Sequence, residues 1–222
     1  MGLYSVRDNS WKFYGDFCDA GSATFSPDGT KVAFEARGKK LDGPNCLSSH
    51  GLFVLTILDL ATGKLTTVPY SGESLVQNAR LSWSPDGRYL VGQVDAWVSP
   101  TKHIVVIEVA SGMGRVIAEG ANPSWSPDGD WIAYMDGAME KCMLIHPDGT
   151  GAKTVLDVSR TSRVLFHGAV WSPDGNKLLL NEAHGILESH TDVMMLDLAT
   201  GKVTSESKNG PAVFGWARNS GE

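Results

Sequence analysis

The sequence predicts an all-β fold in which four-stranded antiparallel units repeat along the chain. The tetrapeptide Ser-Pro-Asp-Gly occurs four times in the 222 residues, beginning at Ser26, Ser84, Ser126 and Ser172. Each copy follows an aromatic residue and precedes a short β-prone run. The copies lie 58, 42 and 46 residues apart (84−26, 126−84, 172−126). A period of about 45 residues is that of a propeller blade, so we expect a β-propeller.

The Ser-Pro-Asp-Gly motif is typical of a tight turn between two strands. Proline sets φ for the first turn position, aspartate bonds to the local backbone, and glycine takes the positive φ that other residues resist. We expect the aromatic residues before the motif to pack as one layer on the first strand of each blade. These residues are Phe25, Trp83, Trp125 and Trp171.

A second repeat supports the same phase. Asp-Leu-Ala-Thr-Gly-Lys stands at 59–64 and again at 197–202, with weaker copies at 108–112 and 146–149. Each copy follows an apolar run and precedes another short β-prone segment. Every unit is therefore predicted to contain strand A, the Ser-Pro-Asp-Gly turn, strand B, a variable loop, strand C, a glycine turn and strand D. No segment has a sustained helical period, so we expect few helices.

The two ends of the chain predict a further, partial blade within a single domain of residues 1–222. The four complete blades are predicted at residues 21–70, 79–119, 122–157 and 168–208. Residues 3–8 and 11–14 resemble strands C and D, and residues 213–216 resemble strand A. We expect residues 1–20 and 211–222 to share a fifth blade, because sharing removes an open edge. The alternative is that the chain is a fragment of a longer propeller.

The segment Pro-Ser-Trp-Ser-Pro-Asp-Gly-Asp-Trp-Ile-Ala-Tyr at 123–134 resembles the WD40-like repeat of TolB-type propellers. The resemblance extends over nearly the whole chain. It implies a propeller that binds other proteins, and a periplasmic or secreted location. Similar blades also form the gating domain of prolyl-oligopeptidase-like peptidases and the whole of oligogalacturonate lyases, which use a histidine-bound metal. The fold alone does not choose among these functions.

Composition and missing motifs exclude several classes of function. The net charge is −6 and no basic patch stands out, so we expect no nucleic-acid partner. No apolar run approaches the roughly 20 residues needed to cross a bilayer, so we expect no membrane partner. No signal peptide is visible at the start of the sequence. The sequence contains no Gly-x-Ser-x-Gly, His-Glu-x-x-His, Cys-x-x-Cys or phosphate-binding glycine loop.

The alternating strand directions predict which loops carry function. The A–B and C–D turns share one face, which we call the turn face, and the B–C and D–A loops share the opposite loop face. The turns are short and nearly identical, whereas variable loops on a rigid scaffold are where binding residues gather. The predicted loop-face segments are 37–51, 71–80, 95–103, 119–122, 135–140, 159–167 and 181–192.

Five of the six histidines fall in these loops. The candidate binding residues are His50, Trp97, His103, Arg163, His167, His184, Glu188 and His190. Within the last loop, His184, His190 and Asp192 are candidate ligands for a divalent metal such as Zn, Mn or Ni. The alternative is ordinary solvated loop polarity. Arg160 and Arg163 could also meet a small acidic ligand.

The three cysteines form no metal-binding pattern. Cys142 lies in a predicted C strand and is expected to be a buried thiol. Cys18 and Cys46 lie in predicted loops that flank one blade on the same face, so we expect them to form a disulfide. Such a bridge would place the protein outside the cytoplasm.

The leading functional hypothesis is a non-catalytic propeller that binds a protein or peptide through its loop face. One alternative is a metal-dependent lyase or hydrolase that acts on an acidic sugar or similar small substrate. Another is the propeller fragment of a larger peptidase-like enzyme.

Overall fold

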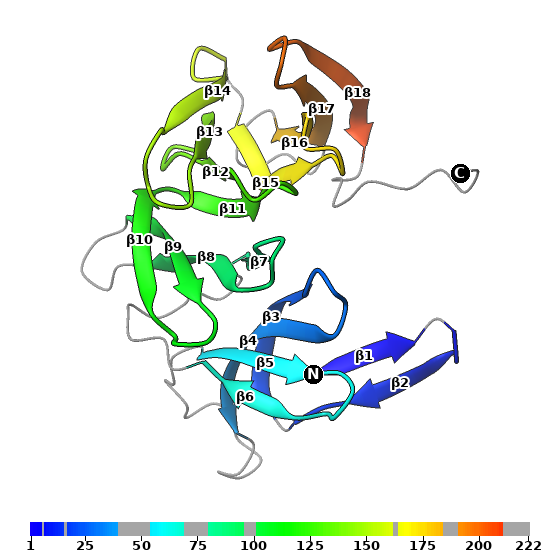
Figure 1. Cartoon of the computed structure of the whole chain (residues 1–222). Helices are drawn as coiled ribbons and strands as arrows, with labels where there is room; N and C mark the ends of the chain where they lie inside the picture. The colour runs from blue at the N-terminus through cyan, green and yellow to red at the C-terminus, as the bar shows by residue number, and fades with distance from the viewer. Residues whose placement is uncertain are drawn as a thin grey trace.

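The computed structural model describes residues 1–5, 7–15, 17–39, 54–68, 80–95, 101–161, 164–183 and 191–210. In these ranges the strands form one two-stranded hairpin and four four-stranded antiparallel sheets. No helix in the described ranges is long and apolar enough to cross a membrane. The predicted all-β fold is confirmed, and Figure 1 shows the four sheets following one another as blades in an arc.

The strands of each blade are hydrogen-bonded in chain order, as the predicted A–B–C–D sequence requires. The hairpin contains β1 (Gly2–Ser5) and β2 (Ser10–Phe13). The first blade contains β3 (Phe17–Phe25), β4 (Lys31–Lys39), β5 (Val54–Asp59) and β6 (Leu65–Thr67). The second contains β7 (Ser82–Trp83), β8 (Tyr89–Asp95), β9 (Lys102–Glu108) and β10 (Gly114–Glu119). The third contains β11 (Ala121–Trp125), β12 (Ile132–Met135), β13 (Lys141–Ile145) and β14 (Lys153–Asp157). The fourth contains β15 (Val164–Trp171), β16 (Lys177–Ala183), β17 (Thr191–Asp197) and β18 (Val203–Gly210).

All four Ser-Pro-Asp-Gly turns share one hydrogen-bond pattern. In the second blade, the Ser84 hydroxyl donates to Asp86 Oδ1 at 2.6 Å and accepts the Tyr89 N–H at 2.9 Å. The Gly87 N–H donates to the Ser84 carbonyl oxygen at 2.9 Å, and Gly87 has a φ of +69°. The same bonds recur around Ser26, Ser126 and Ser172. Asp86 Oδ1 also accepts the Arg88 N–H at 3.0 Å, so the predicted roles of aspartate and glycine are confirmed, and the bonds of the serine hydroxyl add to them.

The core consists of apolar layers between successive blades. Leu55 of the first blade packs with Leu90 of the second, and Val91 of the second packs with Ile132 of the third. Met135 of the third blade packs in one cluster with Leu178 of the fourth. Inner strands have neighbours on both faces, so all four residues of β12 are buried. Apolar runs in such strands are continuous because neither face meets water.

The layer of phased aromatic residues is only partly as predicted. Trp83, Trp125 and Trp171 are 7–8% exposed, but Phe25 is 59% exposed. Each tryptophan packs against the blade that precedes its own. Among the described residues, only the β1–β2 hairpin precedes the first blade, and the hairpin has no strand A to cover Phe25. The predicted packing role of Phe25 is therefore wrong in the described structure.

The hairpin at the start of the chain has one buried and one exposed side. Leu3 and Tyr14 pack on Phe34 of the first blade, where the outer strands of a preceding blade would lie. The predicted strands C and D are thus present as β1 and β2. Figure 1 shows the hairpin and the fourth blade at opposite ends of an open arc, and no described strand joins them. Residues 213–216 lie outside the described residues, so the shared fifth blade remains a prediction.

Candidate functional site

A cavity of about 550 Å³ lies where the inner strands of all four blades meet. Three successive residues from each blade line it, always the three that precede the phased aromatic residue. They are Ser22, Ala23 and Thr24; Arg80, Leu81 and Ser82; Asn122, Pro123 and Ser124; and Gly168, Ala169 and Val170. We call this space the axial cavity. Its wall repeats in backbone position from blade to blade, whereas its side chains differ.

The first residue of each lining triplet has a left-handed backbone conformation. The φ angles are +38° at Ser22, +52° at Arg80, +54° at Asn122 and +75° at Gly168. In three of the blades the strand register also shifts at this point, as in a β-bulge. Bulges re-aim side chains and are frequent next to functional sites. A positive φ costs a non-glycine residue about 1–2 kcal/mol. Ser22, Arg80 and Asn122 therefore carry this backbone strain at equivalent positions in three successive blades.

Contacts between neighbouring blades hold the bulges in place. The Arg80 N–H donates to the Ser22 hydroxyl at 3.2 Å, and the Asn122 N–H donates to Gln93 Oε1 at 3.1 Å. At Gly168 the blades approach so closely that an added Cβ would lie 2.9 Å from both the Cβ and the carbonyl oxygen of Asn122. The cavity wall is therefore held by contacts between blades, and it consists of backbone groups, short polar and apolar side chains, and Arg80.

Arg80 is the single charged residue among the twelve that line the axial cavity. Burial lowers the pKa of Arg80 below its ordinary value. A guanidinium nevertheless stays protonated in proteins and donates up to five N–H bonds in a planar fork. The cavity can therefore hold a polar ligand whose carboxylate or carbonyl oxygens accept from Arg80.

Sequence reasoning missed this cavity as a site. The residues at the bulge are Ser, Arg, Asn and Gly, which share no chemistry. The available signal was positional, because all four stand three residues before Phe25, Trp83, Trp125 or Trp171. Arg80 and Asn122 fall within the predicted loop-face segments 71–80 and 119–122, whereas Ser22 and Gly168 lie outside all of them.

Most of the predicted site residues lie outside the described residues. They are His50, Trp97, Arg163, His184, Glu188 and His190, together with Cys46 of the predicted disulfide. The binding residues, the metal candidates and the bridge therefore remain predictions. Among the described residues, no group of three or more His, Cys, Asp or Glu side chains is arranged to hold a metal ion.

Four residues predicted in loops belong to strands instead. Cys18 lies in β3, His103 in β9, His167 in β15 and Asp192 in β17. The backbone ladder continues past the apolar part of each strand: His103 pairs with Val94, and Asp192 pairs with Glu182. The prediction ended strands where polar residues began, but backbone hydrogen bonds at the mouth of the loop face form regardless of side-chain polarity.

Cys142 is buried in β13, as predicted for a structural thiol. Desolvation raises the pKa of this thiol to about 12. It therefore stays protonated at neutral pH and is neither a nucleophile nor a metal ligand in the folded chain.

Comparisons with known proteins give a likeness in fold. No family model matches the chain, and no curated protein matches its sequence. A protein of Agrobacterium tumefaciens assigned as TolB superposes with a TM-score of 0.68 at 17% identity, over 89% of this chain and 69% of that one. TolB of Acinetobacter baumannii gives 0.65 at 17% identity, over 94% and 49%. The chain has the TolB-like β-propeller fold.

An enzyme superposes on this chain about as well as the TolB structures do. An oligogalacturonate lyase in complex with manganese superposes with a TM-score of 0.64 at 19% identity, over 95% of this chain and 59% of that one. The chain thus spans about half to two thirds of the lengths of these structures. At such identities the likeness defines the fold and leaves the function to be argued from the site.

Proposed function

We propose that the chain is a non-catalytic β-propeller that binds a protein or peptide partner over the axial cavity, on the loop face. The supporting observation is the repeated lining of that cavity by four blades. The backbone positions repeat and are held by bonds between blades, so the surface is rigid. The side chains at equivalent positions differ, and such differences can distinguish one partner from another.

The chain segments that leave the loop face add a second line of support. The segments predicted for the loop face, 37–51, 71–80, 95–103 and 181–192 among them, differ in length and sequence, whereas the Ser-Pro-Asp-Gly turns on the opposite face are identical. The segment 95–103 contains Trp97. An aromatic residue in a polar loop is a common anchor of protein interfaces. From the resemblance of the repeats to TolB-type propellers, the proposal also includes a partner that is a protein and a periplasmic or secreted location.

Peptides selected from a random library on the immobilised full chain would test this proposal. Replacing Trp97 by Ala should weaken the selected peptides by about 2 kcal/mol or more, as buried aromatic anchors do. Replacing Arg80 by Gln should weaken them by about 1.5 kcal/mol, because a hydrogen bond to a charged group is lost.

The matched control is Arg7→Gln, which removes an exposed guanidinium from the turn between β1 and β2. Arg7 does not line the axial cavity. This variant should bind the peptides as the wild type does. If Arg7→Gln weakens binding while Arg80→Gln and Trp97→Ala do not, the loop-face proposal is wrong.

A metal-dependent lyase or hydrolase is the second candidate. It is supported by the likeness to the manganese-bound lyase and by a guanidinium in the axial cavity, since a guanidinium can pair with an acidic sugar. Elemental analysis of the purified protein tests it. A divalent metal that is bound one per chain and is lost in His184→Ala and His190→Ala variants would favour this candidate over the non-catalytic one.

A further inference from the structure

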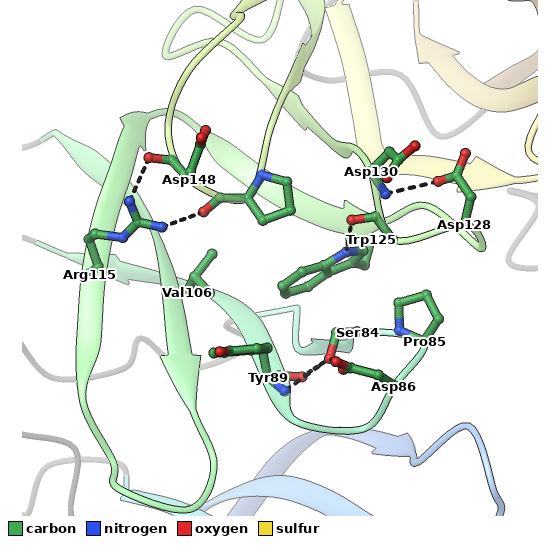
Figure 2. Close-up of a pocket in the computed structure, with 12 residues that line it drawn as sticks. Ser84, Pro85, Asp86, Tyr89, Val106, Arg115, Trp125, Asp128, Asp130 and Asp148 are labelled. Atoms are coloured by element: carbon green, nitrogen blue, oxygen red, sulfur yellow. Dashed lines mark hydrogen bonds between the residues drawn. The ribbon is translucent and has the colours of Figure 1, made fainter.

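A second hollow, of about 500 Å³, opens on the turn face between the second and third blades. Figure 2 shows its residues: the aromatic rings of Tyr89 and Trp125 lie at the centre, carboxylates surround them, and Arg115 lies at one end. The Ser-Pro-Asp-Gly turns of the second and third blades contribute to its wall, as does the turn between β13 and β14. We call it the interblade pocket. It lies on the face opposite the loops and shares no residue with the axial cavity.

The interblade pocket lies where Trp125 departs from the repeat. Trp83 Nε1–H donates to the Thr24 carbonyl oxygen at 3.2 Å, and Trp171 Nε1–H donates to the Ser124 carbonyl oxygen at 3.0 Å. Both acceptors belong to the preceding blade, one residue before its phased aromatic. Trp125 Nε1–H donates instead to the carbonyl oxygen of Gly129, in its own turn, at 3.1 Å. Its indole therefore has a hydrogen-bond partner on the turn face, beside the pocket.

Tyr89 completes an aromatic surface at this interface. Its ring stacks on Trp125 with centroids 6.4 Å apart and planes inclined by 26°. The equivalent positions in the first and fourth blades are Lys31 and Lys177. In the third blade the equivalent Trp131 is already covered by His146, at 3.9 Å between ring centroids. An aromatic surface beside a hollow attracts a cation through the negative faces of its rings.

The charge around the interblade pocket is negative. Four aspartates line it against one lining cation, and the aspartates are Asp86, Asp128, Asp130 and Asp148. The lining cation, Arg115, donates to the carbonyl oxygens of Asp148 at 2.5 Å and Pro147 at 2.7 Å, and so closes one end of the pocket. A second cation, Arg88, lies beside the pocket with its guanidinium carbon 5.4 Å from the centroid of the Tyr89 ring. The Asp130 carboxylate accepts no hydrogen bond from any described residue. It is therefore available to an incoming donor.

We propose that the interblade pocket binds a basic side chain, arginine above all, of a protein or peptide partner. A guanidinium can stack its flat face on an aromatic ring while its N–H groups donate hydrogen bonds to carboxylates in the same plane. The interblade pocket offers both, because Tyr89 and Trp125 form its floor and aspartates form its rim. The apolar stem of the side chain would lie along Val106 and Tyr89. This site is independent of the proposed loop-face binding, and either can fail without the other.

The test uses the full chain with ¹⁵N-labelled indole groups and the blocked peptide acetyl-Gly-Arg-Gly-amide. The Trp125 indole resonance, assigned by its absence in Trp125→Phe, should shift in a saturable way as peptide is added. The matched peptide with citrulline in place of arginine has the same shape without the charge and should not shift it. Asp130→Asn should weaken binding about threefold, as expected for loss of one partly solvated charge pair.

The chain itself supplies the controls. Asn176 occupies the same turn position in the fourth blade and Thr30 occupies it in the first, so Asp130→Asn and, as a second variant, Asp130→Thr should fold like the wild type. Glu119→Gln removes an exposed carboxylate at the loop-face end of β10 and should leave the affinity unchanged. The proposal is overturned if the Trp125 resonance does not respond, if citrulline shifts it equally, or if Asp130 and Glu119 variants bind alike.

Discussion

Single aspartates in the Ser-Pro-Asp-Gly turns couple the fold to pH. In every copy the serine hydroxyl is the main cause of a lowered aspartate pKa, and a backbone N–H adds to it. The pKa falls to about 2 for Asp28 and Asp174. The ordinary value in an unfolded chain is about 3.9. Because the folded pKa is lower, the ionised turns stabilise the fold above the unfolded pKa, and this stabilisation is lost as the pH falls through the folded pKa.

We therefore expect the free energy of unfolding to decrease between about pH 4 and pH 2, where these four carboxylates become protonated. Urea titrations followed by circular dichroism at a series of pH values would measure it. Asp174→Asn should be less stable at neutral pH and should lose less stability on acidification. A free energy of unfolding that stays constant across this range would contradict the role assigned to the turn aspartates.

The three cysteines should differ in reactivity. Cys142 is fully buried and its pKa is raised, so iodoacetamide should modify it only after unfolding. Cys18 and Cys46, if bridged, should resist iodoacetamide even in the unfolded chain until a reductant is added. A bridge over about 28 residues would stabilise the fold by roughly 3 kcal/mol. Peptide mass spectrometry reports all three sites, and free Cys18 and Cys46 thiols in oxidised protein would refute the bridge.

At the scale of strands and turns, a local structure could be predicted from the sequence only where its backbone conformation requires particular residue types. The roles of proline, aspartate and glycine in the Ser-Pro-Asp-Gly turn follow from their residue types, so the position of the turn could be predicted from the sequence, whereas the bonds of the serine hydroxyl were not predicted. The left-handed position three residues before each phased aromatic accepts Ser, Arg, Asn or Gly, so no single residue type marks it in the sequence. The axial cavity that these positions line could therefore not be predicted from residue types.

Gly168 offers a test of that packing. Gly168→Ala must adopt a positive φ and also displace Asn122, whose carbonyl oxygen would lie 2.9 Å from the new Cβ. Gly201, in the last C–D turn, has a similar φ of +69° with nothing within 4 Å of an added Cβ. We expect Gly201→Ala to cost about 1–2 kcal/mol from backbone strain alone. Gly168→Ala should cost about 1–3 kcal/mol more from the steric overlap.

Urea unfolding of the two variants measures this difference directly. Equal losses of stability would mean that the fourth blade can move away from Asn122 at little cost. In that case the axial cavity is a less rigid surface than its contacts between blades indicate.

At the scale of the whole molecule, the repeat period predicted the four complete blades. It did not determine whether the ends of the chain close the ring. The described arc ends in two uncovered surfaces near the start of the chain. Tyr4, Trp11 and Phe13 form an exposed aromatic row on the hairpin, and Phe25 is exposed on the first blade. In the other blades the phased aromatic is covered by the blade before it. An inner strand of the same blade as β1 and β2 would therefore cover Phe25, whereas the aromatic row lies on a face of the hairpin that a neighbouring blade would cover.

We predict that Val213–Trp216 provides that strand, since Trp216 follows Trp171 by 45 residues and keeps the repeat phase (216−171). Deleting residues 1–14 alone would be ambiguous, because it also uncovers Phe34. A cycle of three deletions removes this problem: residues 1–14, residues 211–222, and both. If the ends share a blade, the double deletion should cost less than the sum of the single ones, by about 0.5–3 kcal/mol as for elements in contact. Costs that simply add in urea unfolding would mean that the ends lie apart. A coupling that disappears on dilution would mean that the strand comes from a second copy of the chain.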